Sequence, residues 1–174
     1  MCSGWRQIAW VLVVVVLGTP ALGRAQASPP NSGTYTWNGE LVSLDATAMK
    51  MTVKSRVAYQ EAVAELKQFK PGESVWVVWS GAYDHPDAVR QLRRGEANRK
   101  IEENLILPAE LVSPEAPNQY ITIRVKVPES SLTAIKAVKP GDWVSVTSRH
   151  RPSTDAEAVT AVKPYSSSTN TNTN

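Results

Sequence analysis

Two short words occur twice in this chain, in the same order and at nearly the same spacing. Gly39-Glu-Leu-Val-Ser43 returns as Ala109-Glu-Leu-Val-Ser113, and Lys70-Pro-Gly-Glu-Ser-Val75 returns as Lys139-Pro-Gly-Asp-Trp-Val144. The second word starts 31 residues after the first in one copy and 30 residues after it in the other. Repetition at a fixed spacing indicates a duplicated structural unit, so we expect two related halves.

Each half has the same expected order of elements: strand, strand, short helix, strand. Residues 121–127 alternate apolar and polar side chains, which is the period of a half-buried strand, and Pro128 ends the pattern. A short helical stretch follows at 131–138, and then a Lys-Pro-Gly turn from which a strand leaves at Trp143. The first half repeats this order, with strands expected at 41–45, 49–57 and 74–79 and a helix at 61–69. A closing strand is expected at 159–162.

Residues 86–103 interrupt the repeat. Pro86 stands near the start of this segment, and Val89, Leu92 and Ile101 follow among many charged residues. A proline at the start and spaced apolar residues are typical of an amphipathic helix. We therefore expect an inserted helix here.

These elements predict a mainly β protein with two related OB-like halves of ββαβ type. Two arrangements fit: two small Greek-key barrels, or one barrel in which the halves interlock. The short helix before the Pro-Gly turn favours the OB type. The expected boundaries are 1–27 for a signal peptide, 28–34 for a linker, 35–107 and 108–164 for the halves, and 165–174 for a disordered tail.

The N-terminus has the three parts of a secretory signal. Arg6 precedes an apolar run from Ile8 to Leu17, and Ala25-Gln26-Ala27 supplies the small residues of a cleavage site. The run is about ten residues long, whereas a membrane-spanning helix needs about 20. Cleavage near Ala27 and a periplasmic or secreted mature protein are expected, and an uncleaved N-terminal anchor is the alternative.

Removal of this segment changes the charge and the cysteine content. The full chain carries 19 Lys and Arg against 16 Asp and Glu. Cleavage removes Arg6 and Arg24, which leaves a net charge of about +1, and it removes the single cysteine, Cys2. So small a charge argues against nucleic acid as a partner, and the mature chain is expected to fold without disulfides.

Several segments of this sequence resemble those of a known protein family. They are Tyr120–Val127, Leu132–Val138, Lys139–Val146 and Ala158–Val162, with Gly39–Asp45 as a first strand. They are similar to the periplasmic OB-fold copper- and silver-binding proteins of efflux systems. The resemblance implies an OB-like fold and a soft-metal site built from a His, a Met-x-Met pair and a Trp.

The ligand pattern of that family is altered in this sequence. Ile121 and Ile123 stand where the resemblance places the two methionines. Met49-Lys50-Met51 supplies a Met-x-Met, but on a different strand. Alternation places Met49 and Met51 on one face, where they are expected to be core residues. The alternative is a copper or silver site of Met49, Met51 and His85.

Basic residues gather in the expected inserted helix: Arg90, Arg93, Arg94, Arg99 and Lys100. On a helix the first three share one side, and such a cluster can bind an anionic ligand or an acidic partner. The alternative is a solvated face neutralised by neighbouring acids. Trp76 and Trp79 are three apart on a strand, so one is expected in the core and the other at the surface.

No catalytic constellation is apparent. The chain has no Gly-x-Ser-x-Gly elbow and no glycine-rich phosphate loop, and Asp84-His85-Pro86-Asp87 is typical of a helix cap. The expected function is therefore an exported, non-catalytic binding or accessory module of the bacterial cell envelope. Its expected partner is an envelope protein or an anionic ligand, bound through the basic residues and Trp76. Soft-metal binding is the alternative.

Overall fold

The computed structural model describes residues 33–79, 89–94 and 105–166, and these form a mainly β protein. The elements of the first half are β1 (Thr34–Asp45), β2 (Lys50–Arg56), α1 (Gln60–Leu66), β3 (Ser74–Trp79) and β4 (Val89–Arg94). Those of the second half are β5 (Ile106–Glu115), η2 (Ala116–Asn118), β6 (Tyr120–Lys126), η3 (Glu129–Ser131), α2 (Leu132–Lys136), β7 (Trp143–Arg149), α3 (Asp155–Ala158) and β8 (Val159–Pro164).

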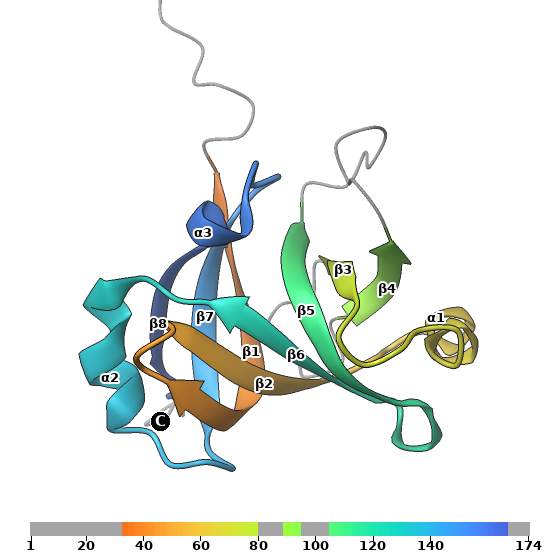
Figure 1. Ribbon diagram of the computed structural model, residues 1–174, viewed down its shortest axis with the longest axis horizontal. Coiled ribbons are helices and arrows are strands. Elements are labelled where there is room, and N and C mark those ends of the chain that lie inside the picture. Colours follow the sequence, from red (N-terminus) through yellow and green to blue (C-terminus); the bar gives the residue numbers. More distant parts are fainter. Residues whose placement is uncertain (1–32, 80–88, 95–104, 167–174) are drawn as a thin grey trace, which may run out of the picture.

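All these strands belong to one open, eight-stranded antiparallel sheet (Figure 1). Their order is β4-β3-β5-β6-β2-β1-β7-β8. The order is symmetric: β4, β3, β5 and β6 from one edge correspond to β8, β7, β1 and β2 from the other edge. The third strand of each half pairs with the first strand of the other half: β3 with β5, and β7 with β1. Both expected arrangements are therefore corrected: the described strands share one open sheet, and they form neither two separate barrels nor one closed barrel.

The repeated words have matching local geometry. The β1–β2 ladder shifts register between Leu41 and Ser43, and the β5–β6 ladder shifts between Leu111 and Ser113. These are the same positions of the Glu-Leu-Val-Ser word. A bulge at this point bends the strand and increases its twist, so both halves bend their long first strand in the same place.

The two Pro-Gly turns also match, and each lies against the other half. Gly72 donates its N–H to the carbonyl of Leu111 at 2.7 Å, and Gly141 donates to the carbonyl of Leu41 at 2.7 Å. The φ angles are 86° at Gly72 and 94° at Gly141, a left-handed conformation that glycine adopts without steric cost. Each Lys-Pro-Gly turn thus forms a hydrogen bond with the Glu-Leu-Val-Ser motif of the opposite half.

The inserted helix expected at 86–103 is wrong over the described part of that segment. Residues 89–94 form strand β4, which pairs with β3. Val89 and Leu92 are both buried, and a spacing of three fits a helix as well as a strand with an irregular register. That ladder does shift register between Val78 and Trp79. The rest of the expected helix lies outside the described residues.

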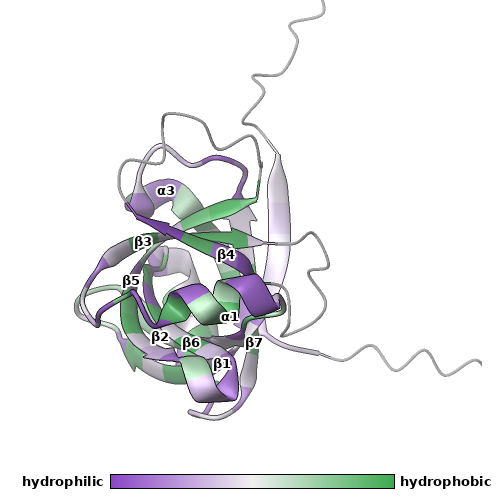
Figure 2. Ribbon diagram, turned by 90° about the vertical axis from the view of Figure 1, so that its right-hand side faces the viewer, coloured by the Kyte–Doolittle hydropathy of each residue, from purple (hydrophilic) through white to green (hydrophobic). Residues whose placement is uncertain are grey.

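The sheet curls so that strands that are not neighbours meet across the core (Figure 2). Trp37 of β1 stacks on Trp79 of β3, with ring centroids 4.7 Å apart, and its Nε1 donates to Ser148 Oγ at 2.9 Å. Tyr35 of β1 donates its hydroxyl to the carbonyl of Ile106 in β5 at 3.0 Å. One face of the sheet thereby encloses a single apolar core.

The two edge strands are covered in the same way. Helix α1 packs against β4, and α2 packs against β8. Ala58, just before α1, donates its N–H to the carbonyl of Val89 at 2.9 Å, and Val162 of β8 donates its N–H to Ser131 Oγ at 3.0 Å. Covered edges protect a sheet from pairing with other chains.

The expected signal peptide, 1–27, lies outside the described residues. Of the expected tail, Tyr165 still donates its N–H to the carbonyl of Trp143 at 2.9 Å, and residues 167–174 lie outside the described part. The apolar residues 106–108 continue into the second Glu-Leu-Val-Ser motif within one strand, β5. No helix in the described ranges is long and apolar enough to cross a membrane.

Candidate functional site

A cleft of about 360 Å³ lies over strands β2, β3, β5 and β6 and is bordered by α3. Its lining combines one large aromatic ring, Trp76, with a ring of charged side chains. The charged residues are Lys50, Glu110, Arg124, Lys126 and Asp155. We take this cleft as the candidate functional site, because concave surfaces with a few convergent polar groups are where ligands usually bind.

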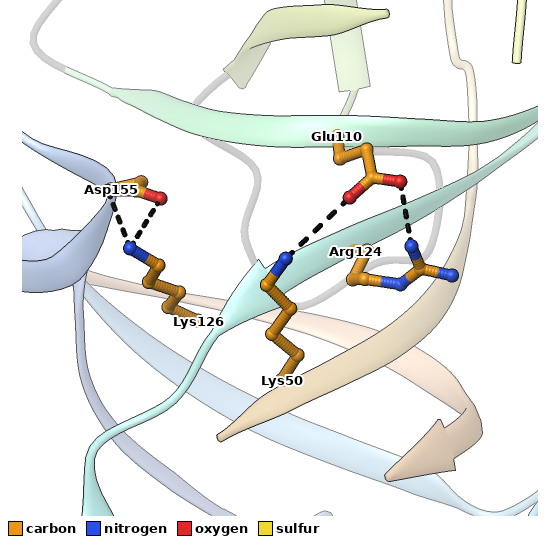
Figure 3. A network of polar contacts seen from close by, with 5 residues as sticks. All are labelled: Lys50, Glu110, Arg124, Lys126 and Asp155. Atoms are coloured by element: carbon orange, nitrogen blue, oxygen red, sulfur yellow. Dashed lines mark hydrogen bonds and ion pairs between the residues drawn. The ribbon is translucent and has the colours of Figure 1, made fainter. Parts of the chain in front are cut away.

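Cross-strand pairing brings the charges together (Figure 3). Glu110 faces Arg124 in the β5–β6 ladder, and Arg124 Nη1 donates to Glu110 Oε1 at 2.7 Å. The other carboxylate oxygen of Glu110 lies 3.9 Å from Lys50 Nζ. Lys126 Nζ lies 3.0 Å from Asp155 Oδ2, which joins β6 to α3. Five charges from four elements thus converge on one hollow.

These ion pairs remain accessible to solvent. The side chains of Glu110 and Arg124 are 36% and 37% exposed, and that of Lys126 is 42% exposed. Ion pairs at such positions contribute only about 0–1 kcal/mol to stability. The cations can therefore exchange a protein carboxylate for a ligand anion at low energetic cost.

Trp76 is the aromatic wall of the cleft. It faces Pro108 in the β3–β5 ladder and Arg93 in the β3–β4 ladder. Trp76 is half-buried, whereas Trp79 is 2% exposed in the core. The expected division of the two tryptophans between core and surface is confirmed.

The arginines of β4 do not form the single patch expected from a helix. Arg93 and Arg94 face Trp76 and Val75, and successive residues of a strand point to opposite faces. Both Arg93 Nε and Nη2 donate to Gln91 Oε1. Arg90 lines a second hollow of about 270 Å³ beside α1. The proposed contacts through Arg99 and Lys100 lie outside the described residues.

Arg94 instead serves the Pro-Gly turn of its own half. Its Nε donates to Glu73 Oε2 at 2.8 Å, its guanidinium carbon lies 4.4 Å from the centre of the Phe69 ring, and its Nη2 donates to the carbonyl of Gln68. The hydrogen bond from Arg94 lowers the pKa of Glu73, and the N–H of Lys70 adds to this effect. Arg94 therefore has a structural role in holding the turn.

The two methionines of the soft-metal alternative lie in different environments. Met51 is fully buried in the core, whereas Met49 is 45% exposed in the turn before β2 and has a φ of 52°. The expectation that they share a face is wrong, because the strand begins at Lys50 and its alternation does not extend to Met49. His85 lies outside the described residues. Within the described ranges, no three His, Cys, Asp or Glu side chains are grouped to hold a metal ion.

The charged residues of the cleft were not singled out from the sequence. In the sequence, Lys50, Arg124 and Lys126 are recognisable only as polar residues that alternate with apolar residues along a strand. Their convergence depends on which strands are neighbours, and the repeat alone left that open. A usable signal was present, since opposite charges at Glu110 and Arg124 become cross-strand partners once β5 is paired with β6.

The chain has been compared with protein-family models, with curated proteins and with solved structures, and none of the three comparisons finds a match.

Proposed function

We propose that this protein is an exported, non-catalytic binding module of the bacterial cell envelope, and that it holds an anionic ligand in the cleft beside Trp76. The observation that carries the proposal is the convergence of Lys50, Arg124 and Lys126 on a hollow with an aromatic wall. Export rests on the signal-like pattern of residues 1–27. The basic face expected on an inserted helix is replaced by this cleft as the binding surface.

The proposal extends to the origin of the fold. The two halves are related by duplication of one ββαβ unit, and they interlock in an OB-like arrangement. The matched register shifts in β1 and β5 support this origin, as do the matched contacts of Gly72 and Gly141. In this arrangement the cleft belongs to both halves, because β3 and β2 come from the first half and β5 and β6 from the second.

The binding proposal predicts a specific change in the tryptophan signals of the mature chain. We expect an anionic fraction of the host's envelope extract to shift the indole N–H resonance of Trp76 in two-dimensional NMR. The Trp79 indole, which is buried in the core, serves as an internal control and stays in place. Salt screens exposed charges, so the shift should weaken between low and high ionic strength.

A control variant distinguishes binding in the cleft beside Trp76 from binding in the second hollow beside α1. A Tyr59→Ala variant alters the second hollow and should leave the Trp76 shift unchanged. The proposal is wrong if no fraction moves the Trp76 resonance, or if the affected resonances gather around Tyr59 and Arg90 instead.

A further inference from the structure

The two halves differ at the place where the cleft has its aromatic wall. Trp76 and Pro108 are cross-strand partners, and the corresponding partners of the other half are Ser145 and Asn38. Ser145 Oγ donates to Asn38 Oδ1 at 2.9 Å, so that position is closed by a polar pair. The other half carries its aromatic elsewhere, at Trp143 opposite Glu40, so the shared fold does not require the Trp76–Pro108 pair itself.

The charged pair next to it is common to both halves. Glu110 faces Arg124, and in the other half Glu40 faces Lys54. A feature present in both halves is explained by the sheet that they share. Trp76 with Pro108 is present in one half only, so it needs a separate explanation, and ligand binding provides one.

We propose that the ligand is an acidic saccharide, one that carries a carboxylate on a sugar ring; this inference rests on the proposed function of the cleft. A sugar ring has an apolar face and a polar rim. Trp76 offers a flat apolar surface for the face, and the charged residues around it offer donors and acceptors for the rim.

The backbone around the cleft argues for a saccharide over an extended peptide. A peptide that adds to a sheet needs an unpaired strand edge. The strands that line the cleft are β2, β3, β5 and β6, and each has a neighbour on both sides in the sheet. Recognition in the cleft must therefore come from side chains, which suits a ligand that has hydroxyl groups along its whole length.

The charge balance of the cleft argues for a carboxylate on that ligand. Among the lining residues that the structure describes, three cations, Lys50, Arg124 and Lys126, stand against two carboxylates, Glu110 and Asp155, which leaves an excess of one positive charge. Glu110 holds Arg124 at 2.7 Å but Lys50 only at 3.9 Å. Lys50 is thus the cation with the weakest contact here, and it is placed to bind a ligand carboxylate.

The test uses the mature chain and a matched pair of ligands, trigalacturonate and its fully methyl-esterified form. The pair differs in charge while the sugar rings stay the same. Calorimetric titration should show trigalacturonate binding roughly tenfold or more tightly than the ester, since hydrogen bonds to charged groups exceed neutral ones by this order. Trp76→Ala should abolish binding of both forms. Lys50→Gln should weaken trigalacturonate alone.

Each other outcome overturns the inference in a recognisable way. Equal binding of acid and ester removes the carboxylate from the proposal. Binding of pentaglutamate at Trp76 without binding of trigalacturonate makes the ligand an acidic peptide and leaves the proposed function intact. If none of these probes binds but the envelope extract still shifts the Trp76 resonance, the inference of an acidic saccharide is wrong and the proposed binding function of the cleft is retained. If the extract also fails, both proposals are wrong.

Discussion

At the residue scale, Trp37 connects equivalent positions of the two halves. Its ring stacks on Trp79 and its Nε1 donates to Ser148 Oγ, and Trp79 and Ser148 hold the same place in β3 and β7. The two positions thus carry different residues that both contact one side chain. Trp37 and Ser148 are fully buried, so water cannot replace a lost hydrogen bond easily.

We expect Ser148→Ala to lower the free energy of unfolding by about 1–3 kcal/mol, because the substitution leaves the Trp37 N–H buried without its acceptor. Urea denaturation measures the change. In a Trp37→Phe background the donor is already gone, so the same serine substitution should cost much less. An equal cost in both backgrounds would show that the hydrogen bond does not stabilise the fold.

At the element scale, β4 shows that the sequence repeat extends beyond the Glu-Leu-Val-Ser and Lys-Pro-Gly motifs. Asp87-Ala-Val89 corresponds to Glu157-Ala-Val159, and Val89 and Val159 follow Lys70 and Lys139 by 19 and 20 residues. Both valines begin strands, β4 and β8, each paired with the strand that leaves a Pro-Gly turn. The charge-rich composition of 86–103 favoured a helix, but the position in the repeat indicated a strand.

The two turns give a paired prediction. Gly72→Ala and Gly141→Ala should each lower the free energy of unfolding by about 1–2 kcal/mol, because a Cβ is disfavoured at positive φ. In the described part of the chain, no atom other than those of the glycine and its two chain neighbours would lie within 4 Å of an added Cβ, so the cost should come from the backbone alone. Chemical denaturation compares the two.

Gly33→Ala is the control for the turn variants, since the nearest atoms to its added Cβ lie at 3.5 Å, an ordinary contact distance. It should be close to neutral. A turn variant as stable as the unmodified chain would argue against a strained αL requirement at that turn.

At the scale of the whole molecule, neither half completes its own sheet. In the second half, β5 has β3 of the first half on one side, and β7 has β1 of the first half on one side. The turn at Gly141 is also held by Leu41 of the first half. The two halves therefore complete each other's hydrogen bonding as well as the core.

The interlocking predicts that residues 105–166 do not fold as a monomer. Alone, this fragment keeps β6 beside β5 and β8 beside β7, but it lacks β3 and β1, which pair with the other edges of β5 and β7. Because β3 and β7 are equivalent, two copies can supply each other's missing strand, so a symmetric homodimer is the expected folded form. Light scattering with circular dichroism tests this. A folded, monomeric 105–166 would contradict the interlocked arrangement.

The sequence by itself determined the order of most elements and the existence of a repeat. Strands at 74–79 and 121–127 and helices at 61–69 and 131–138 were predictable, because alternation and turn chemistry are local properties of neighbouring residues. The Pro-Gly turns were predictable for the same reason. The prediction for Met49 was wrong, because this residue lies in a turn and has a positive φ. An apolar residue in a turn cannot be told from an apolar strand residue by alternation alone.

Only the tertiary structure decided how the halves join and where the charges meet. Two barrels and one shared sheet use the same local elements and differ only in whether β3 pairs within its half or with β5. That choice is made by contacts between residues far apart in the chain. The cleft follows from it, because Trp76, Arg124 and Lys50 lie on β3, β6 and β2, which the pairing of β3 with β5 places within four consecutive strands of the sheet.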